Sequence, residues 1–329
     1  MKRFLIIGGE TFIGASLARR LIRDGKEVHI ITQRQESLWR FSDLMLSMKH
    51  HVIDLSNSEE VFATLNAIKA EVIINTISYG ENPNETALDL TYDNNFFNLL
   101  LLIEQAKDVG FSCFINTGSC QEYGRQQDAF SERTVPEPLT HLGISKTSAT
   151  MYCLKEAKKS NLPIYTVRPF EYYGPFQNRE SFLNKLFMHT MIDVKFNRYY
   201  ANASYDFIFA DDLVNIYLAI AKQLPTNTFV FNGGSGTSYR LRDVVSQFEN
   251  IWQHDITIDW NTYSDLGFSL ESRGRCFSDQ TLTNAILQHL PPQQTLNSGI
   301  KTTFDWFTQN QLVYEDYRLN QLHQLHSSI

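Results

Sequence analysis

The stretch Lys2–Gly14, KRFLIIGGETFIG, decides the fold. The apolar run at residues 4–7 predicts a strand buried on both faces, as in a parallel sheet. Gly8 and Gly9 permit a sharp turn and a close approach to a ligand, and Gly14 lets the following helix pack tightly on the strand. That helix directs free N–H groups and the positive end of its dipole at an anion, so we expect a dinucleotide pyrophosphate here.

One position of this turn departs from the usual spacing, because Thr11 stands where the middle glycine is expected. Its Cβ crowds the phosphates but does not forbid them. The context favours a binding turn, since a helix over 15–23 and a second strand over 28–31 follow. An ordinary strand–turn–helix without a ligand is the alternative. The positions expected to contact the cofactor at this turn are Gly8, Thr11, Phe12, Ile13 and Gly14.

Composition restricts the class of protein. The 329 residues are 43% hydrophobic and 20% charged, which is typical of a globular chain. The net charge of −7 and the lack of a long basic run argue against nucleic acid or an anionic membrane as main partner. No apolar run is long enough to span a membrane and no signal peptide precedes the first strand, so we expect a cytoplasmic protein. The four cysteines lack metal-binding spacing, which predicts thiols and no metal site.

Strands and helices alternate through the first half, which predicts an α/β fold with a Rossmann-type doubly wound parallel sheet. The second strand ends at Thr32-Gln33-Arg34, with no acid to hold a ribose 2′-hydroxyl. Because an arginine there can pair with a 2′-phosphate, we expect NADP(H) to be preferred over NAD(H). The alternative is that Arg34 is a solvated loop residue.

Two further strand ends point to the same edge of the sheet. The third strand ends at Asp54-Leu55, where a carboxylate can meet the adenine amino group. The fourth strand, residues 72–75, runs into Thr76, Ile77, Ser78, Tyr79 and Gly80, at the carboxyl edge where α/β proteins bind ligands. The helix around 95–106 is apolar nearly all round, so it is either a subunit interface or wholly internal.

Three later motifs follow in a fixed order. The fifth strand, residues 114–116, runs into Thr117, Ser119 and Tyr123-Gly124. Next comes Gly143-Ile144-Ser145-Lys146 near the start of a helix, and the sixth strand, residues 164–168, leads into RPFEYYGP at 168–175. Together with the glycine turn, this order resembles the extended short-chain dehydrogenase/reductase, or NAD-dependent epimerase/dehydratase, family. The resemblance runs from residue 1 to about 308 and includes residues 206–212, 232–236 and 277–279.

The resemblance implies an NAD(P)-dependent enzyme that oxidises or reduces a sugar carbon, usually on a nucleotide diphosphate sugar. Residues 73–77 and 171–174 are similar to those of reductases that make nucleotide-linked 3,6-dideoxyhexoses, so a 4-keto reduction is one expectation. In the family a serine, a tyrosine and a lysine act together on the reacting oxygen. Ser119 and Lys146 match the serine and the lysine. The tyrosine position, four residues before the lysine, is Leu142, which can neither donate nor accept a proton.

The missing tyrosine leaves three interpretations open. Another group supplies the proton, or the reaction does not depend on this transfer, or the protein binds cofactor and ligand without turnover as a regulatory or ligand-binding protein. His141 is adjacent but lies about 100° round the helix. Our catalytic candidates are Ser119, Lys146, Tyr123 and His141, with Glu122, Tyr79 and Tyr172 as further proton donors to consider.

The resemblance also implies the remaining contacts. The expected cofactor positions beyond the glycine turn are Arg34, Asp54, Leu55, Thr76, Ile77, Asn95, Thr117, Lys146, Pro169 and Phe170. The expected substrate positions are Ser78, Tyr79, Glu171, Arg273 and Arg275. The family arginine before Asp206 is here Tyr205, so cations for a diphosphate must come from shifted positions.

The chain is expected to form two lobes. Residues 1–174 plus 205–231 make the NAD(P)-binding domain, because the segment from Asp206 to Ile220 reads as a strand and a helix that return to the sheet. Residues 175–204 plus 232–329 make a smaller α+β substrate lobe. We also expect a homodimer through the helices at 88–107 and 141–158.

Overall fold

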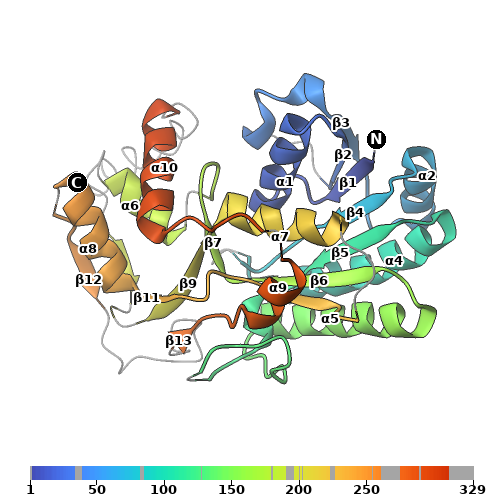
Figure 1. Cartoon of the computed structure of the whole chain (residues 1–329). Coiled ribbons are helices and arrows are strands. Elements are labelled where there is room, and N and C mark those ends of the chain that lie inside the picture. The colour runs from blue at the N-terminus through green and yellow to red at the C-terminus, as the bar shows by residue number, and fades with distance from the viewer. Residues whose placement is uncertain are drawn as a thin grey trace.

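The computed structural model describes residues 2–33, 39–81, 85–126, 128–178, 181–189, 196–199, 201, 203–222, 227–253, 255–260, 275–288 and 290–310. Two lobes lie side by side, a larger α/β lobe that contains the N-terminus and a smaller lobe that contains α8 and α10 (Figure 1). Within these residues, seven strands form one parallel sheet in the order β10-β6-β5-β4-β1-β2-β3. The Rossmann-type doubly wound sheet expected from the sequence is therefore confirmed.

The strands of the large sheet are short and rich in β-branched and aromatic residues, which suits a sheet buried on both faces. The second and third strands lie on one side of the first strand, and the fourth lies on its other side. The direction in which strands are added therefore reverses at the first strand, beside the glycine turn. The strands are β1 (Arg3–Ile7), β2 (Glu27–Thr32), β3 (Lys49–Val52), β4 (Val72–Asn75), β5 (Cys113–Thr117), β6 (Ile164–Pro169) and β10 (Val230–Gly233).

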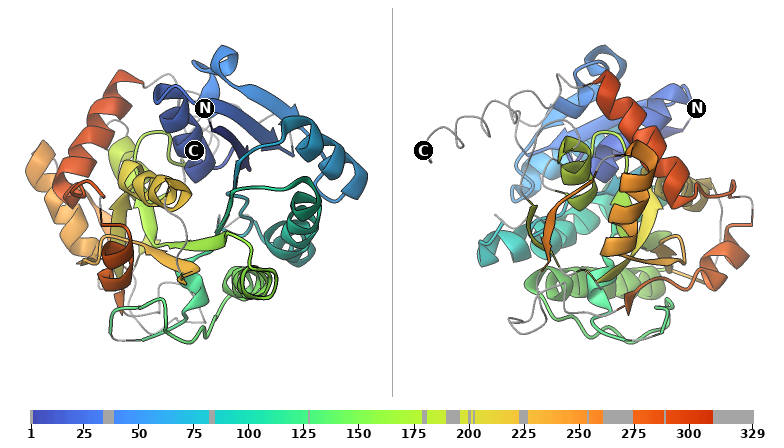
Figure 2. Two further views of the ribbon diagram at one scale, coloured as in Figure 1. Left: turned by 45° about the vertical axis from the view of Figure 1, so that its right-hand side comes forward. Right: turned by 90° about the vertical axis from the view of Figure 1, so that its left-hand side faces the viewer.

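Helices cover both faces of this sheet (Figure 2). On one face α1 (Phe12–Arg23) and α7 (Ala210–Lys222) pack together over the apolar side chains of β1, β4 and β6. On the other face lie α2 (Ser58–Ile68), α4 (Asn98–Val109) and α5 (His141–Ser160). Both cores consist mainly of buried aliphatic side chains with some aromatic ones, and the sheet is thereby held between two packed layers.

The segment before α4 is not a regular α-helix. It contains α3 (Leu88–Tyr92) and then a π-helical turn, η3 (Asp93–Phe97), which runs directly into α4. The turn places Asn95 inward, where its side chain is 2% exposed. Two short 3₁₀ turns also occur: η2 (Met45–Ser47) precedes β3, and η4 (Cys120–Glu122) follows β5. A π-turn of this kind often marks a functional site, because it re-aims one side chain within a helix.

The smaller lobe is built on a second sheet in the order β11-β9-β13, to which β7 adds on β9. An aromatic-rich core that includes Tyr173, Phe187 and Phe248 joins this sheet to its helices. Its strands are β7 (Glu171–Tyr173), β9 (Ser204–Phe209), β11 (Ser238–Arg240) and β13 (Arg275–Cys276), with a separate pair β8 (Phe196–Tyr199) and β12 (Ile258–Trp260). Its helices are α6 (Phe182–His189), α8 (Leu241–Trp252) and α10 (Leu296–Gln309), while α9 (Thr281–Ile286) lies against β10.

One sequence expectation about the lobes is wrong. The strand that begins near Asp206 is β9, and it pairs with β7, β11 and β13 in the smaller sheet rather than in the large one. The helix that follows, α7, does pack on the large sheet, and the strand that completes that sheet is β10. A strand with alternating apolar residues has the same sequence pattern in the large sheet and in the smaller one, so the pattern could not show which sheet contains it.

Candidate dinucleotide and substrate site

The glycine turn leaves no room for larger side chains. Gly8 has φ of +79°, a left-handed conformation that disfavours other residues. A Cβ on Gly14 would lie 2.3 Å from the carbonyl oxygen of Gly8 and 2.7 Å from Thr76 Oγ1. Helix α1 is therefore in direct backbone contact with the turn, which holds its N-terminus at the carboxyl end of β1.

Thr11, the departure from the glycine pattern, caps α1. Its Oγ1 accepts a hydrogen bond from the N–H of Gly14 at 3.0 Å and donates to Thr76 Oγ1 at 3.0 Å. Thr76 in turn donates to the carbonyl oxygens of the β1 end, at 2.8 Å for Gly8. The N–H groups of Thr11, Gly14 and Ala15 have acceptors in the turn, so the amides of Phe12 and Ile13 are the ones that can face an external anion.

Two charged residues that the sequence reasoning missed lie beside this turn. Glu10 is in the turn itself, and burial raises the pKa of its carboxyl group. Arg40 is 5% exposed and donates through Nη1 to the Glu10 carbonyl at 2.8 Å and through Nε to the Phe176 carbonyl at 2.8 Å. Arg40 thus connects the cofactor turn to the loop after β7. Arg40 lies six residues beyond Arg34, the arginine expected at the cofactor, and no motif spacing in the sequence pointed to it.

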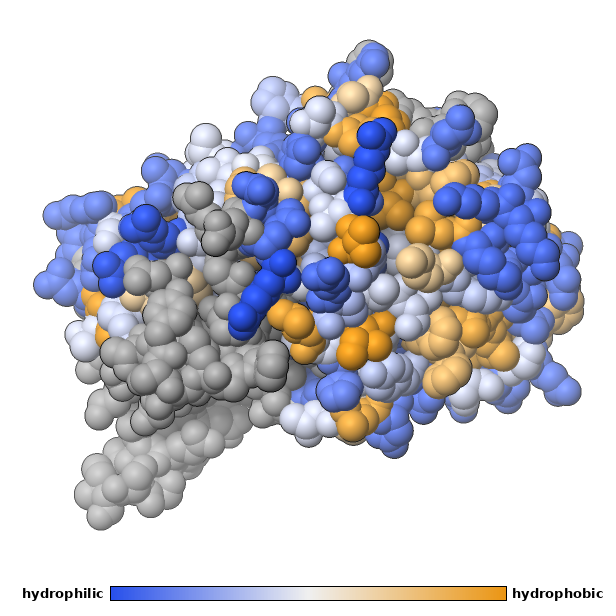
Figure 3. All heavy atoms as spheres, turned by 90° about the horizontal axis from the view of Figure 1, so that it is seen from below, coloured by the Kyte–Doolittle hydropathy of each residue, from blue (hydrophilic) through white to orange (hydrophobic). Residues whose placement is uncertain are grey.

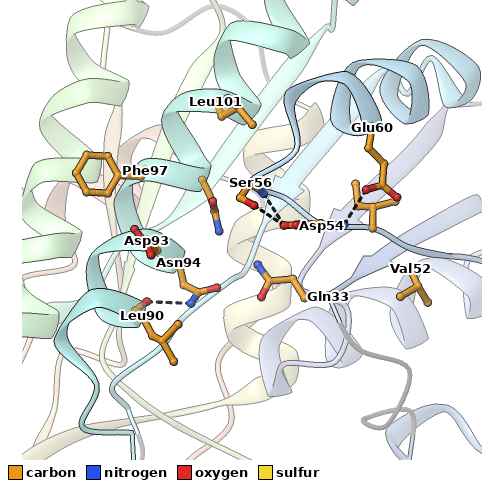
Figure 4. Close-up of a pocket in the computed structure, with 12 residues that line it drawn as sticks. Gln33, Val52, Asp54, Ser56, Glu60, Leu90, Asp93, Asn94, Phe97 and Leu101 are labelled. Atoms are coloured by element: carbon orange, nitrogen blue, oxygen red, sulfur yellow. Dashed lines mark hydrogen bonds between the residues drawn. The ribbon is translucent and has the colours of Figure 1, made fainter.

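A pocket of about 800 Å³ opens at the ends of β2 and β3 (Figure 4). Asp54, the residue expected at the adenine, lines it, and its carboxylate accepts from Ser56 N–H at 2.9 Å and Ser56 Oγ at 2.7 Å. These hydrogen bonds lower the pKa of Asp54. Leu55 points into the core instead. The other lining residues are Gln33, Val52, Ile53, Glu60, Leu90, Asp93, Asn94, Phe97, Asn98 and Leu101.

The volume and lining of this pocket suit the adenosine half of a dinucleotide, because carboxylates and amides can accept from an amino group and from ribose hydroxyls. Asp54, Glu60 and Asp93 are its acidic side chains, and the described lining residues include no cation. Arg34, the basis for expecting NADP(H), lies outside the described residues.

Lys146 lies between the ends of β4 and β5. It is 1% exposed, and its Nζ donates to the Ile77 carbonyl at 2.7 Å and to the Thr117 carbonyl at 3.0 Å. Burial lowers the pKa of Lys146 to about 8, against the opposing influence of Glu81 and Glu122. Two of its three N–H donors are used in this way, so one is left for a ligand.

Ser119 caps the 3₁₀ turn η4 and is half-buried. Its Oγ accepts from Gln121 N–H at 3.1 Å, and its own N–H donates to Glu122 Oε1 at 2.9 Å. Ser119 is two residues beyond Thr117, whose carbonyl accepts from Lys146. The structure therefore places Ser119 and Lys146 at neighbouring points of one sheet edge.

Leu142, which the sequence motif aligns with the family tyrosine, is 4% exposed. It lies one helical turn before Lys146 on α5 and packs near Gly80, where an added Cβ would be 3.7 Å from Leu142 Cβ. Its carbonyl accepts from Ser145 Oγ at 2.9 Å. The helix start is thus well packed without a phenol, and proton transfer must use another group or be absent.

Two catalytic candidates point away from this edge. Tyr123 is 1% exposed, stacks on Phe130 and donates its hydroxyl to Asn232 Oδ1 at 2.7 Å. Burial raises the pKa of Tyr123, which makes its hydroxyl a poor acid. His141 is exposed, and its Nδ1 lies 3.3 Å from Tyr92 Oη. Both sequence positions are therefore engaged elsewhere in the structure.

Several expected cofactor positions brace the site through their side chains. Asn95 exchanges hydrogen bonds with the backbone of Tyr79, at 2.9 and 2.8 Å, and donates to Ser145 Oγ at 3.0 Å. Thr117 Oγ1 lies 2.9 Å from Tyr217 Oη, on the α7 side of the sheet. Pro169 ends β6, and Phe170 is 3% exposed beside Tyr123.

The expected substrate positions differ in what surrounds them. Ser78 Oγ is buried and has no hydrogen-bond partner within the described part of the chain. Glu171 is exposed on β7, while Tyr172 stacks on Phe12 and donates to Glu81 Oε2 at 2.9 Å. Arg273 lies outside the described residues, as does the side chain of Arg275 on β13.

Comparison with known proteins identifies the family. Residues 4–232 match the model of the NAD dependent epimerase/dehydratase family, and the chain belongs to that family. A trifunctional UDP-glucose 4,6-dehydratase/UDP-4-keto-6-deoxy-D-glucose 3,5-epimerase/UDP-4-keto-L-rhamnose-reductase of Arabidopsis thaliana is 23% identical over 94% of the chain. The chain spans about half of that relative, 47% of its length.

Solved structures share the fold over nearly the whole chain. UDP-glucuronic acid 4-epimerase from Bacillus cereus, in complex with UDP-glucuronic acid and NAD, is 21% identical with a TM-score of 0.78, covering 93% of this chain and 99% of the other. A dTDP-glucose 4,6-dehydratase from Bacillus anthracis, in complex with NAD, is 18% identical with a TM-score of 0.83, covering 96% and 99%. The relatives are thus nucleotide-sugar epimerases and dehydratases.

The residues of this chain fit a dinucleotide. The cradle formed by Gly8 and Gly14 is one that a Cβ would fill, and two helix amides face outward from it. Within the described residues, no group of His, Cys, Asp and Glu side chains has metal-binding geometry. No described helix is long and apolar enough to cross a membrane. The candidate site thus brings together a glycine turn, a pocket of adenosine size and a buried lysine.

Proposed function

We propose that the chain is an NAD(P)-dependent oxidoreductase or epimerase of a nucleotide-linked deoxysugar, and that its reaction is the reduction of a 4-keto group. The observation that carries this proposal is the family membership together with Ser119 and Lys146 at one sheet edge. When bound there, a reduced nicotinamide supplies the hydride. Ser119 polarises the carbonyl oxygen by donating from Oγ, which stabilises the charge that develops on it.

In our proposal Lys146 supplies the proton that the family takes from a tyrosine. A carbonyl that receives a hydride must also receive a proton on oxygen, and an ammonium group with a pKa of about 8 is protonated at pH 7. In the reverse direction the same step needs a neutral amine, which is the minor form at that pH. Below about pH 8 Lys146 is therefore mainly in the form that can protonate a carbonyl oxygen. The rate should fall as the pH rises above about 8, because the ammonium form is lost.

Turnover tests the proposal directly. Loss of absorbance at 340 nm is followed with NADPH or NADH and UDP-4-keto-6-deoxy-D-glucose, over pH 6 to 9. Turnover that declines at high pH and is lost in Ser119→Ala and Lys146→Met is the expected result. Turnover that survives both substitutions together would place the chemistry elsewhere.

A second candidate function is cofactor binding without catalysis. It is favoured by Leu142, which fills the tyrosine position with a buried aliphatic side chain. A chain that binds NAD(P)H but turns over none of a panel of 4-keto nucleotide sugars would support this regulatory or ligand-binding role.

The preference for NADP(H) over NAD(H) is part of the proposal and rests on Arg34. The three carboxylates of the adenosine pocket favour NAD(H) instead, because they repel a 2′-phosphate and accept from ribose hydroxyls. Titrating both reduced cofactors into the wild type and Arg34→Gln separates the two effects. If Arg34 decides, the variant loses NADPH affinity alone; if wild type prefers NADH, the carboxylates decide.

We also propose a homodimer through the helices at 88–107 and 141–158. Leu88 on α3, and Ile144 and Met151 on the outer side of α5, are 52%, 40% and 54% exposed. Apolar patches lie over this side of the molecule when it is seen from below (Figure 3). Sedimentation of the wild type and of Met151→Glu tests this: a dimer that the substitution dissociates is expected, and a wild-type monomer contradicts it.

A further inference from the structure

A fully buried ion pair lies directly behind the candidate catalytic serine. Glu122 is 0% exposed, and its Oε2 accepts from Arg168 Nη2 at 2.8 Å and from Arg168 Nε at 2.9 Å. Glu122 belongs to the 3₁₀ turn η4, and Arg168 belongs to β6, so the pair joins two neighbouring segments of the ligand-binding edge. Arg168 also lies over the ring of Tyr123, 4.5 Å from its centroid.

The second carboxylate oxygen of Glu122 reaches the catalytic segment itself. Oε1 accepts the N–H of Ser119 at 2.9 Å and completes a capping box with that residue. A Cβ on Gly118 would lie 2.3 Å from the same oxygen, so the carboxylate occupies the space next to the backbone of residues 118–119. The orientation of Ser119 is therefore fixed by a group that is itself fixed by Arg168.

The pair also contributes to the charge around Lys146. The charged groups that face this ammonium are Glu81 from the loop after β4, Glu122 from η4 and, behind Glu122, Arg168 from β6. The Glu81 carboxylate accepts from the Tyr172 hydroxyl. Glu122 and Glu81 both favour the protonated form of Lys146 and oppose the effect of burial.

Stability alone does not account for such a pair. Removing two charges from water costs free energy that their attraction only partly returns, and an apolar pair of similar volume is often as stable. A buried pair that touches the backbone of one catalytic residue and favours the charge of the other has a different use. A site of this kind needs supporting residues that hold its reacting groups in place.

We propose that Glu122 and Arg168 are positioning residues: Glu122, held by Arg168, orients Ser119 for the reacting oxygen and places a carboxylate charge on the Lys146 side of the site. This inference rests on the proposed function. Neither side chain is assigned contact with cofactor or substrate. Each acts through Ser119 and Lys146.

The test compares two variants with a matched control. Glu122→Gln removes one charge and keeps the shape, while the double variant Glu122→Met/Arg168→Met replaces the pair by apolar side chains and avoids an unpaired buried charge. Glu156→Gln is the control, because Glu156 on α5 is also buried and pairs with Lys107 of α4 at 3.0 Å, outside the Ser119 and Glu122 segment. NADPH affinity is measured by fluorescence from pH 6 to 9, and turnover with UDP-4-keto-6-deoxy-D-glucose.

In the wild type, both affinity and rate should decline as Lys146 loses its proton near pH 8. In Glu122→Gln this midpoint should move to lower pH, by about one pH unit, because the supporting carboxylate charge is gone and Arg168 is left unpaired. In the double variant kcat should fall about 10-fold or more, with the KM for NADPH changed less than about 3-fold, since Ser119 loses its support. Glu156→Gln should match the wild type in both measurements.

Two results would overturn the inference. A folded double variant with the rate and pH midpoint of the wild type shows that the pair has no positioning role, and the proposed function then stands unaffected. If Glu122→Gln does not fold, the double variant alone decides. A wild-type chain that binds neither NADPH nor NADH overturns the proposed function and, with it, this inference.

Discussion

The two helix starts at the ligand-binding edge, residues 11–14 and 140–143, follow the same local design. Each begins with a threonine whose Oγ1 accepts from the N–H of a glycine three residues later, at 3.0 Å in both cases. Each glycine is in close backbone contact, since a Cβ on Gly143 would lie 2.5 Å from the Gln121 carbonyl. The residue before each glycine is a buried aliphatic, Ile13 at 5% exposed and Leu142 at 4%.

The difference lies in what the two starts are needed for. At α1 an aliphatic residue before the glycine is sufficient for the proposed role, in which backbone N–H groups bind the phosphates. At α5 the family chemistry uses a phenol at that position, and this chain has Leu142 instead. The threonine cap and the glycine contact form at both helix starts, so neither contact depends on a phenol before the glycine. The comparison shows that the same cap and glycine contact can form whichever side chain precedes the glycine, so the chemistry of the two helix starts has to be tested separately.

The largest expected effect tests the shared design. Gly14→Val forces a side chain into the backbone contact with Gly8, so we expect a loss of about 3 kcal/mol of stability and of detectable NAD(P)H binding. Gly143→Val should destabilise similarly, because it disturbs the turn that carries Ser119. Urea unfolding and fluorescence titration measure both effects.

The control is a glycine with open space around it. Gly25→Ala meets no atom within 4 Å, and only its φ of +66° opposes the substitution, so a loss of about 1 kcal/mol with normal cofactor affinity is expected. If Gly14→Val bound NADPH as tightly as Gly25→Ala, the anion-binding role of the first helix start would be wrong.

The next effect separates the two helix starts. Lys146→Met removes the ammonium group that lies one turn into α5, and we expect cofactor affinity to fall about 10- to 100-fold through the lost charge-assisted hydrogen bond. The matched control is Lys158→Met, an exposed lysine near the end of the same helix. Equal affinities for the two variants would show that only the α1 start binds the dinucleotide.

A smaller effect concerns Leu142 at the second helix start. Leu142→Tyr restores a phenol one turn before Lys146, and we expect kcat to rise about 10-fold if the site has simply lost its acid. Leu142→Phe adds the ring without the hydroxyl and should not raise the rate. A drop in rate with Leu142→Tyr would instead assign the leucine a positive role.

The smallest effect concerns the β2–β3 edge beside the first helix start. His29 Nδ1 lies 3.0 Å from His51 Nε2, and burial lowers the pKa of both side chains. Because the unfolded chain protonates first, near pH 6.5, stability should decline as the pH falls below that value toward the lower folded pKa. Urea midpoints at pH 7.5 and 5.5 measure the decline. It should be smaller in His51→Gln and unchanged in the exposed-site control His141→Gln.

Local sequence patterns predicted the large sheet and the glycine turn after its first strand. The apolar run before Gly8, the strand at 72–75 and the threonine–glycine helix starts are decided by neighbours in sequence. Lys146 and Ser119 were found through family spacing, and their backbone partners lie at the edge that was expected. That Leu142 stands at the family tyrosine position stays a prediction, as does its chemical consequence.

The remaining features depend on contacts between distant residues. Glu122 and Arg168 are 46 positions apart, and nothing in either segment indicates that they pair. Tyr123 lies in a catalytic motif, yet its hydroxyl bonds Asn232, which is 109 positions away. The assignment of β9 to the smaller sheet was missed for the same reason. Local pattern gives the element, and only packing gives its partner.

The return of the chain through α7 and β10 has a consequence for engineering. The path leaves the larger lobe after β6, comes back to add a helix and an edge strand, and then leaves again. A fragment that ends near residue 175 would lack β10 and expose the buried flank of β6, where Phe231 faces Tyr165. The smaller lobe therefore cannot be exchanged as one continuous segment. A chimaera that carries the smaller lobe of another protein needs a new junction at each point where the chain passes between the lobes.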